Sequence, residues 1–189
     1  MKDGRHLILM PTIVLVSVVA AVTLVLALVH MATAPVIEER LDRTANEARF
    51  KVFSEADSFK KIPVNRAFDT KGSILEVYKA NDGSGVVITS QSSGFGGKVT
   101  VMTGIRKNGE ITGVFILNHK ETPGIGEKPM EEDYLSAYIG ASEIVLDRRA
   151  DDDDPGVRID TVTGATITSV AIFEAVEKAL AYFAKTGGI

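Results

Sequence analysis

The chain opens with a long apolar run and then changes to a mixture of polar and apolar positions. Positions 7 to 37 contain no Asp, Glu, Lys or Arg, and Leu7 to Met31 is almost entirely apolar. As a helix with a rise of about 1.5 Å per residue, this run exceeds the hydrocarbon core of a bilayer, which is about 30 Å thick. The pattern therefore predicts one membrane-spanning helix over residues 7–34.

A cleaved signal peptide is the alternative interpretation of the apolar run. Its apolar core is normally about 7 to 15 residues long, which is shorter than the run found here. The small residues Ala32-Thr33-Ala34 are followed by Pro35, a poor residue for a cleavage site. A retained anchor is therefore the favoured interpretation.

The charges that flank the apolar run predict its orientation. Lys2 and Arg5 precede the run, whereas Glu38 and Glu39 follow it. The positive-inside rule then puts residues 1–6 in the cytoplasm. We expect a single-pass protein of the cytoplasmic (inner) membrane, in contact with lipid, whose main domain lies outside the cytoplasm.

The outer part of the chain is predicted to be a stalk followed by a domain. Residues 35–60 fit a stalk helix and linker, with helical spacing from Val36 to Phe53, and residues 61–189 form the domain. Asp82-Gly83 and Asn108-Gly109 favour tight hairpin turns. They separate segments rich in Val, Ile and Thr that we expect to be strands: Ile74 to Lys79, Val86 to Gln91, Lys98 to Arg106 and Glu110 to Leu117.

The remaining elements make the predicted fold α+β. A short helix is expected over Pro129 to Ile139, and another strand over Ile144 to Leu146. A C-terminal helix starts near Thr168 and stops at Gly187, because apolar residues recur on one face with helical spacing: Ile172, Val176, Ala179, Leu180 and Phe183. Consecutive hairpins then give an antiparallel sheet with flanking helices, preceded by the N-terminal membrane helix.

Composition removes several classes of function. The 189 residues include no Cys, which excludes disulfides, thiol catalysis and iron–sulfur ligation, so redox chemistry here needs an organic cofactor or other metal ligands. The net charge of −4 argues against binding to nucleic acid. The acidic run Asp151 to Asp154 is interpreted as a solvated loop, and we predict no metal site.

The segment from Asp160 to Thr166 is the strongest candidate for chemistry. It combines a strand end, a glycine turn and hydroxyl residues directly before the C-terminal helix. Free N–H groups and the positive end of the helix dipole would favour a phosphate near Thr166 and Thr168. The alternative is that Thr163, Thr166 or Thr168 caps the helix, and local physics alone favours this cap.

The order of residues in this segment changes the balance between the two interpretations. A pattern of Asp160, Thr163, Gly164, Ala165 and Thr166 arises by chance in well under about one in a thousand chains of this size. It resembles the flavinylation motif of the FMN-binding domain family. The resemblance implies that Thr166 carries FMN through a phosphoester bond. It also implies a separate flavin transferase, which installs FMN from FAD and recognises the other four positions.

A second segment indicates which members of this family the chain resembles most. Asn118 to Gly126 is similar to the flavin-lining segment of the G subunit in Rnf-type ion-translocating electron-transport complexes, and of the related C subunit in sodium-pumping NADH:quinone reductases. The glycine-rich stretch Gly94 to Gly97 also fits this family. The short chain and its single predicted span resemble the Rnf-type G subunit more closely.

The residues of the second segment suit the wall of a cofactor site. Pro123-Gly124 fits the centre of a type II turn, with Pro fixing φ and Gly124 supplying a positive φ. Glu121 and Thr122 then offer hydrogen bonds to ring or ribityl oxygens, and His119 can neutralise a phosphate or tune the flavin. The alternative is an ordinary corner between a strand and a loop, with His119 on the surface.

The resemblance implies an electron-relay subunit of a membrane-bound ion-translocating ferredoxin:NAD oxidoreductase complex. The other redox subunits are its partners, covalent FMN carries the electrons, and no side chain of this chain is catalytic, so it is not a complete enzyme alone. Three alternatives stay open. The first is a subunit of a sodium-pumping NADH:quinone reductase that is similar to the C subunit of such enzymes. The other two are an independent membrane-anchored extracellular flavin carrier and a noncatalytic membrane scaffold.

Overall fold

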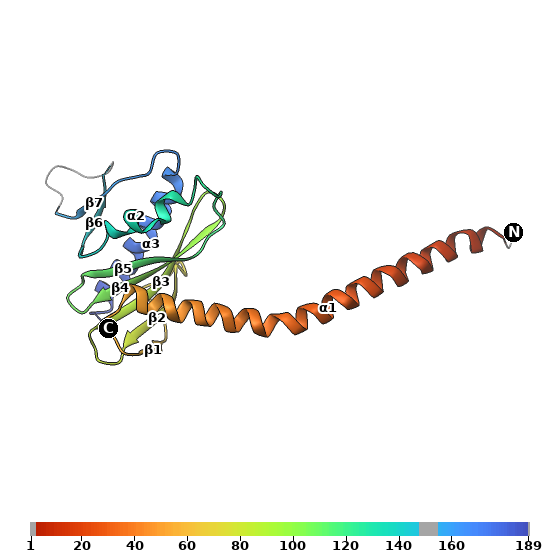
Figure 1. Cartoon of the computed structure of the whole chain (residues 1–189), viewed down its shortest axis with the longest axis horizontal. Coiled ribbons are helices and arrows are strands. Elements are labelled where there is room, and N and C mark those ends of the chain that lie inside the picture. Colours follow the sequence, from red (N-terminus) through yellow and green to blue (C-terminus); the bar gives the residue numbers. More distant parts are fainter. Residues whose placement is uncertain (1–2, 148–154, 189) are drawn as a thin grey trace. The chain divides into compact units, whose positions relative to one another are not determined.

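The computed structural model describes residues 3–147 and 155–188 of the chain (Figure 1). The acidic run Asp151–Asp154, expected to be a solvated loop, lies outside the described residues. The chain divides into two compact units, Met1–Thr44 and Ala45–Ile189. Each unit is described by itself below.

The N-terminal unit consists of a long apolar helix, as predicted. Helix α1 runs from Asp3 to Val52 and enters the second unit with its last turns. Its segment Leu9–Ala34 has a mean hydropathy of 2.9 and is long and apolar enough to cross a membrane. The segment predicted as a stalk helix, from Val36 to Phe53, is helical up to Val52 and continues α1, which passes through Pro35 without a break.

The second unit is built around a five-stranded antiparallel sheet, which confirms the α+β prediction. The strands follow one another in the sheet in the order of the sequence. All four pairings are antiparallel. The strands are β1 (Phe59–Ile62), β2 (Ile74–Ala80), β3 (Gly85–Ser93), β4 (Lys98–Arg106) and β5 (Ile111–Asn118).

The two hairpin turns lie where the sequence puts them. Gly83 connects β2 to β3 with φ of 74°, and Gly109 connects β4 to β5 with φ of 92°. Both values are in the left-handed region, which glycine enters without the steric cost that a Cβ imposes. These local turn residues therefore fix the succession of hairpins.

Three short elements differ from the prediction. Strand β1 was not expected. The strand end expected at Asp160 belongs to β7 (Val157–Ile159), whose parallel pairing with β6 (Ile144–Leu146) was not predicted. The predicted helix over Pro129 to Ile139 is smaller, with a 3-10 turn η1 (Lys128–Met130) and then α2 (Glu132–Ser136). Such short segments bury few residues, so they leave little periodicity in the sequence.

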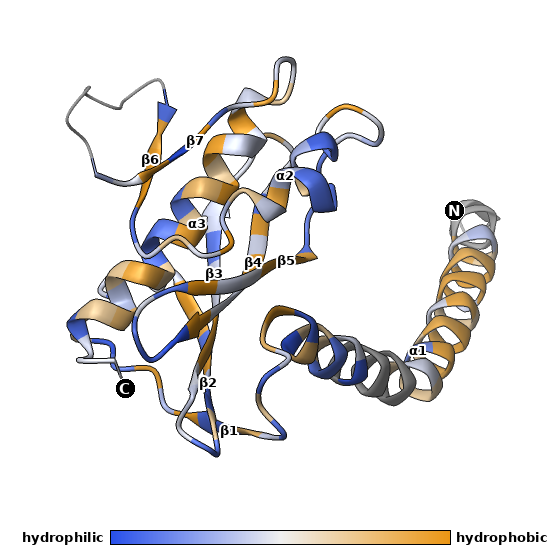
Figure 2. Cartoon of the chain, turned by 60° about the vertical axis from the view of Figure 1, so that its left-hand side comes forward, coloured by the Kyte–Doolittle hydropathy of each residue, from blue (hydrophilic) through white to orange (hydrophobic). Residues whose placement is uncertain are grey.

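Helix α3 (Thr166–Lys185) forms the main layer against the sheet. Its buried face packs on β3 and β4, and the Ser90 hydroxyl of β3 donates a 2.8 Å hydrogen bond to the Ala175 carbonyl. Val52 in the last turn of α1 and the following residue Phe53 pack against the side of the sheet that carries Val87. Figure 2 shows hydrophobic residues, in orange, along α3 and along the strands that it packs on.

The contact between α3 and the sheet predicts a large effect of truncation at Ile172, which is 0 % exposed. We expect Ile172→Ala to lower the free energy of unfolding by about 2–5 kcal/mol, because it removes buried methyl groups and leaves a cavity. Urea unfolding of the detergent-solubilised full chain, followed by circular dichroism, measures the change. The matched control is Ile139→Ala at a site that is 56 % exposed, and an equal loss in both variants would contradict the assignment of the core.

Candidate functional site

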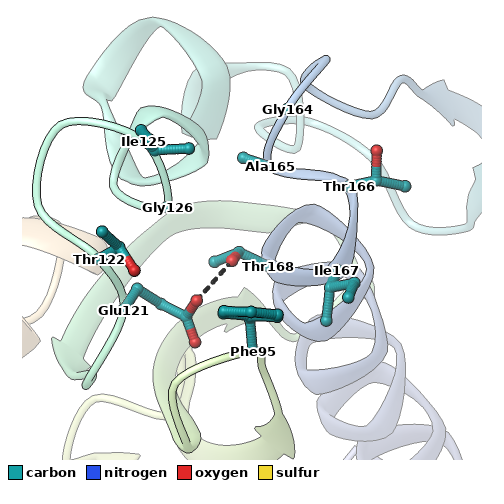
Figure 3. Close-up of a pocket in the computed structure, with 10 residues that line it drawn as sticks. All are labelled: Phe95, Glu121, Thr122, Ile125, Gly126, Gly164, Ala165, Thr166, Ile167 and Thr168. Atoms are coloured by element: carbon teal, nitrogen blue, oxygen red, sulfur yellow. Dashed lines mark hydrogen bonds between the residues drawn. The ribbon is translucent and has the colours of Figure 1, made fainter.

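A cavity of about 450 Å³ lies where three segments of the second unit meet. The segments are the loop between β3 and β4, the loop after β5, and the start of α3 (Figure 3). They are far apart in the sequence and are brought together by the sheet and by α3. The residues that line the cavity are Phe95, Glu121, Thr122, Ile125, Gly126, Gly164, Ala165, Thr166, Ile167 and Thr168.

A tight turn leads into α3 at the cavity. The Ala165 N–H donates a 2.9 Å hydrogen bond to the Val162 carbonyl, and Gly164 between them has φ of 84°. Ser169 holds this turn from inside the helix, because its hydroxyl oxygen accepts a 3.0 Å hydrogen bond from the Val162 N–H. The turn therefore has a fixed position relative to the first turn of α3.

The start of α3 has no side-chain cap among the residues that the structure describes. Its N-cap residue is Ala165, and no described side chain makes a capping hydrogen bond there. The alternative in which Thr163, Thr166 or Thr168 caps the helix is therefore wrong. The first N–H groups of an α-helix have no partner within the helix, so this uncapped end is a favourable position for an anion.

The structure distinguishes the threonines of the motif from one another. Thr168 is 2 % exposed, and its hydroxyl donates a 2.8 Å hydrogen bond to Glu121 Oε2. Thr166 is half-buried and lines the cavity, and in the described part of the chain its hydroxyl has no hydrogen-bond partner. Thr163 is exposed and lies outside the cavity wall. Of the three, Thr166 combines a free hydroxyl with a position at the cavity.

The second wall contains the turn predicted at Pro123-Gly124. Gly124 has φ of 75°, and the Ile125 N–H donates a 3.3 Å hydrogen bond to the Thr122 carbonyl, as a type II turn requires. The Gly126 N–H donates to the same carbonyl at 2.9 Å. This compact turn exposes Thr122 and Ile125 on its surface, where both line the cavity.

Six of the ten predicted site residues line the cavity, and four do not. Those in the wall are Glu121, Thr122, Gly164, Ala165, Thr166 and Thr168. Gly124, Asp160 and Thr163 are exposed outside the wall. His119 is also outside it, and its Nδ1 accepts a long 3.4 Å hydrogen bond from the Glu121 N–H.

Four further residues in the wall were not among the predicted site residues. They are mainly apolar, and they are Phe95, Ile125, Gly126 and Ile167. Three of them lie inside motifs that the sequence already singled out, and Ile167 directly follows Thr166. One signal in the sequence could have identified them. A large apolar residue in a loop segment, such as Phe95 between two glycines, often marks a binding site.

Tyr134 of α2 binds the backbone at the first residue of the motif. Its hydroxyl donates a 2.7 Å hydrogen bond to the Asp160 carbonyl. Burial raises the pKa of the Tyr134 hydroxyl above its ordinary value, so the phenol keeps the proton that it donates. Burial also raises the pKa of the neighbouring Tyr138, whose ring centroid lies 6.1 Å from that of Tyr134.

Comparison with known proteins identifies the family. The model of the FMN-binding domain family matches residues 94–181, which include all three cavity segments. The G subunit of the Na⁺-translocating ferredoxin:NAD⁺ oxidoreductase complex from Acetobacterium woodii is 32 % identical over 179 residues, covering 87 % of this chain and 85 % of that protein. The chain belongs to the G-subunit family of ion-translocating oxidoreductase complexes. The resemblance inferred from the motifs is therefore confirmed.

Two further similarities agree with this family. The G subunit of a proton-translocating ferredoxin:NAD⁺ oxidoreductase complex from Clostridium ljungdahlii is 26 % identical, covering 83 % of this chain and 81 % of that protein. The crystal structure of the C subunit of a Na⁺-translocating NADH-quinone reductase from Parabacteroides distasonis has a TM-score of 0.50 at 21 % identity. It covers 66 % of this chain and 67 % of that chain, and it shows a shared fold.

The cavity suits FMN in size and in chemistry. Its volume of about 450 Å³ is within the range of about 300–1,000 Å³ that small-molecule sites occupy. Phe95, Ile125 and Ile167 supply apolar surface for a flat ring system, and the uncapped start of α3 supplies N–H groups for a phosphate. No group of three or more metal-ligating side chains occurs among residues 3–147 and 155–188.

Proposed function

We propose that this chain carries FMN joined to Thr166 by a phosphoester bond. The observation that carries the proposal is the free Thr166 hydroxyl at the uncapped start of α3, in the wall of a cavity inside the FMN-binding match. Thr168 is a poor acceptor by comparison, because its hydroxyl is buried and bonded to Glu121.

A flavin transferase would load the chain, with FAD as the source of FMN. The Thr166 hydroxyl oxygen forms the new bond to the FMN phosphorus, the diphosphate bond of FAD breaks, and AMP leaves with the hydroxyl proton. The exposed motif residues Asp160, Thr163 and Gly164 are accessible to such an enzyme. A covalent bond retains the cofactor when its site opens, which matters for a domain outside the cytoplasm.

The bound flavin would relay electrons between redox subunits of a membrane complex that connects ferredoxin and NAD. FMN supplies the redox chemistry, and the chain supplies its attachment, orientation and surroundings. The relatives from Acetobacterium woodii and Clostridium ljungdahlii support this assignment, because both are named as subunits of ferredoxin:NAD⁺ oxidoreductase complexes. Ion translocation would belong to other subunits, since the described part of the chain offers one apolar span.

The attachment predicts that Thr166→Val abolishes covalent flavin while the fold stays intact, because valine keeps the shape of threonine and lacks the hydroxyl. The chain is expressed with a flavin transferase, denatured, and examined by intact mass and in-gel fluorescence. The wild type should gain the mass of FMN minus water. Thr161→Val is the matched control, since Thr161 lies outside the cavity wall; an adduct that survives in Thr166→Val would overturn the proposal.

The relay predicts loss of electron transfer without loss of assembly. In membranes of the native host, Thr166→Val should reduce ferredoxin-dependent NAD reduction to the level of a strain that lacks the chain. The other subunits should still copurify with the variant, because the substitution leaves the protein surface elsewhere unchanged. Full electron transfer in a flavin-free variant would instead support the scaffold alternative.

The proposed topology predicts which ends of the chain a membrane-impermeant maleimide reaches. The sequence contains no Cys, so single reporter cysteines can be added without background. Asn108→Cys at the exposed turn between β4 and β5 should be labelled in cells with an intact cytoplasmic membrane. Asp3→Cys should be labelled only after lysis, and the opposite result would reverse the orientation.

A further inference from the structure

Glu121 is a buried carboxylate in the wall of the cavity. It is 6 % exposed, and within the described residues no Lys, Arg or His pairs with it. Its Oε1 accepts a 3.1 Å hydrogen bond from the Gly96 N–H, and its Oε2 accepts one of 2.8 Å from the Thr168 hydroxyl. A carboxylate is costly to bury, so these two donors are what makes its position favourable.

The two donors belong to the other two walls of the cavity. Gly96 is in the loop between β3 and β4, Thr168 is in the first turn of α3, and Glu121 itself is in the loop after β5. Figure 3 shows the Glu121 carboxylate pointing toward Thr168 and lying beside Phe95, with the hydrogen bond to Thr168 drawn. A single carboxylate therefore joins all three segments that form the cavity.

Glycines around Glu121 leave the space that this arrangement needs. A Cβ added at Gly94 would overlap Glu121 Oε1, and one added at Gly96 would overlap the Lys120 carbonyl oxygen. A Cβ added at Gly126 would lie 2.9 Å from the Glu121 Cβ. The loop of residues 94–97 thus rests directly on Lys120 and Glu121, and larger residues would push it away.

Phe95 is the side chain whose position depends on this arrangement. It stands between Gly94 and Gly96, lines the cavity, and is 73 % exposed. So exposed a ring has little packing of its own to hold it, whereas its neighbour Gly96 is bound to Glu121. The hydrogen bond next to Phe95 therefore limits where its ring can lie.

We propose that Glu121 is a positioning residue that holds Phe95 as the aromatic wall of the flavin site. Its carboxylate fastens the loop of residues 94–97 to α3, so the Phe95 ring stays against the space that the isoalloxazine of FMN would occupy. The part of this proposal that concerns the flavin rests on the proposed function. The fastening of the loop is a property of the chain alone.

Two substitutions of Glu121 test whether its two hydrogen bonds hold the loop of residues 94–97. Glu121→Gln can keep both contacts, because its amide oxygen can accept from the Gly96 N–H and its NH₂ can donate to the Thr168 hydroxyl oxygen. Glu121→Ala loses both contacts. Glu127→Ala is the matched control, since Glu127 Oε2 accepts a 3.1 Å hydrogen bond from the Gly124 N–H in the same loop without reaching residues 94–97.

The first experiment measures hydrogen exchange of the Gly96 amide by NMR in the flavin-free full chain in detergent. Glu121→Ala should accelerate this exchange by at least about tenfold, because local opening no longer breaks a hydrogen bond to a carboxylate. Glu121→Gln and Glu127→Ala should stay close to the wild-type rate. If Glu121→Ala does not fold, Thr168→Val replaces it, and a faster Gly96 exchange is again expected.

The second experiment measures iodide quenching of flavin fluorescence in chains with equal FMN content. Glu121→Ala should raise the quenching constant to that of Phe95→Ala, whereas Glu121→Gln should keep the wild-type value. Thermal unfolding is followed in the same samples. It shows whether a variant has lost stability in general, which would raise the quenching constant without any specific effect on Phe95. Agreement of Glu121→Ala with the wild type would overturn the role of Glu121 at the flavin.

The outcomes separate this inference from the proposed function. A Gly96 amide that exchanges equally fast in the wild type and in Glu121→Ala overturns the inference, even when Thr166 carries FMN normally. A Glu121→Gln variant that behaves like Glu121→Ala also overturns it. If the wild type never acquires FMN, the proposed function fails, whereas the exchange rates still decide whether Glu121 fastens the loop.

Discussion

The packing of α3 across the sheet is the constraint on which the candidate site depends. Ile172 and Ala175 are fully buried against the strands, and the Ser90 hydroxyl ties β3 to the Ala175 carbonyl. A helix held so firmly along its length has a fixed N-terminus. That N-terminus lies beside the loop between β3 and β4 and the loop after β5, so the sheet that stabilises the domain also assembles its cavity.

Helix geometry explains why two nearby threonines have different roles. Successive residues of an α-helix are rotated by about 100°, so Thr166 and Thr168 point to nearly opposite sides of its first turn. Thr168 faces the buried carboxylate of Glu121, whereas Thr166 keeps a free hydroxyl at the cavity. One turn of helix thus offers both a structural hydrogen bond and the proposed attachment point, without competition between them.

Most of the elements predicted correctly have a strong local pattern, although the short strand β6 was also predicted. Strands β2 to β5 alternate with turn residues, and α3 has an apolar stripe long enough to recognise. Strand β1 has two exposed lysines among its four residues, and β7 has three residues paired only with β6, so neither shows a hydrophobic period. Helix α1 continues through Pro35, because one proline removes one hydrogen bond and the remaining turns can continue.

The sequence by itself determined the features that contiguous residues specify. These are the apolar N-terminal helix, the hairpin turns, and the motif that ends at Thr166 in front of an amphipathic helix. Tertiary structure decided which side chains share the cavity. Glu121 and Thr168 are 47 residues apart, and Gly96 precedes Glu121 by 25, so their hydrogen bonds exist only after the sheet and α3 have packed. No local period encodes such contacts, since packing of distant segments creates them.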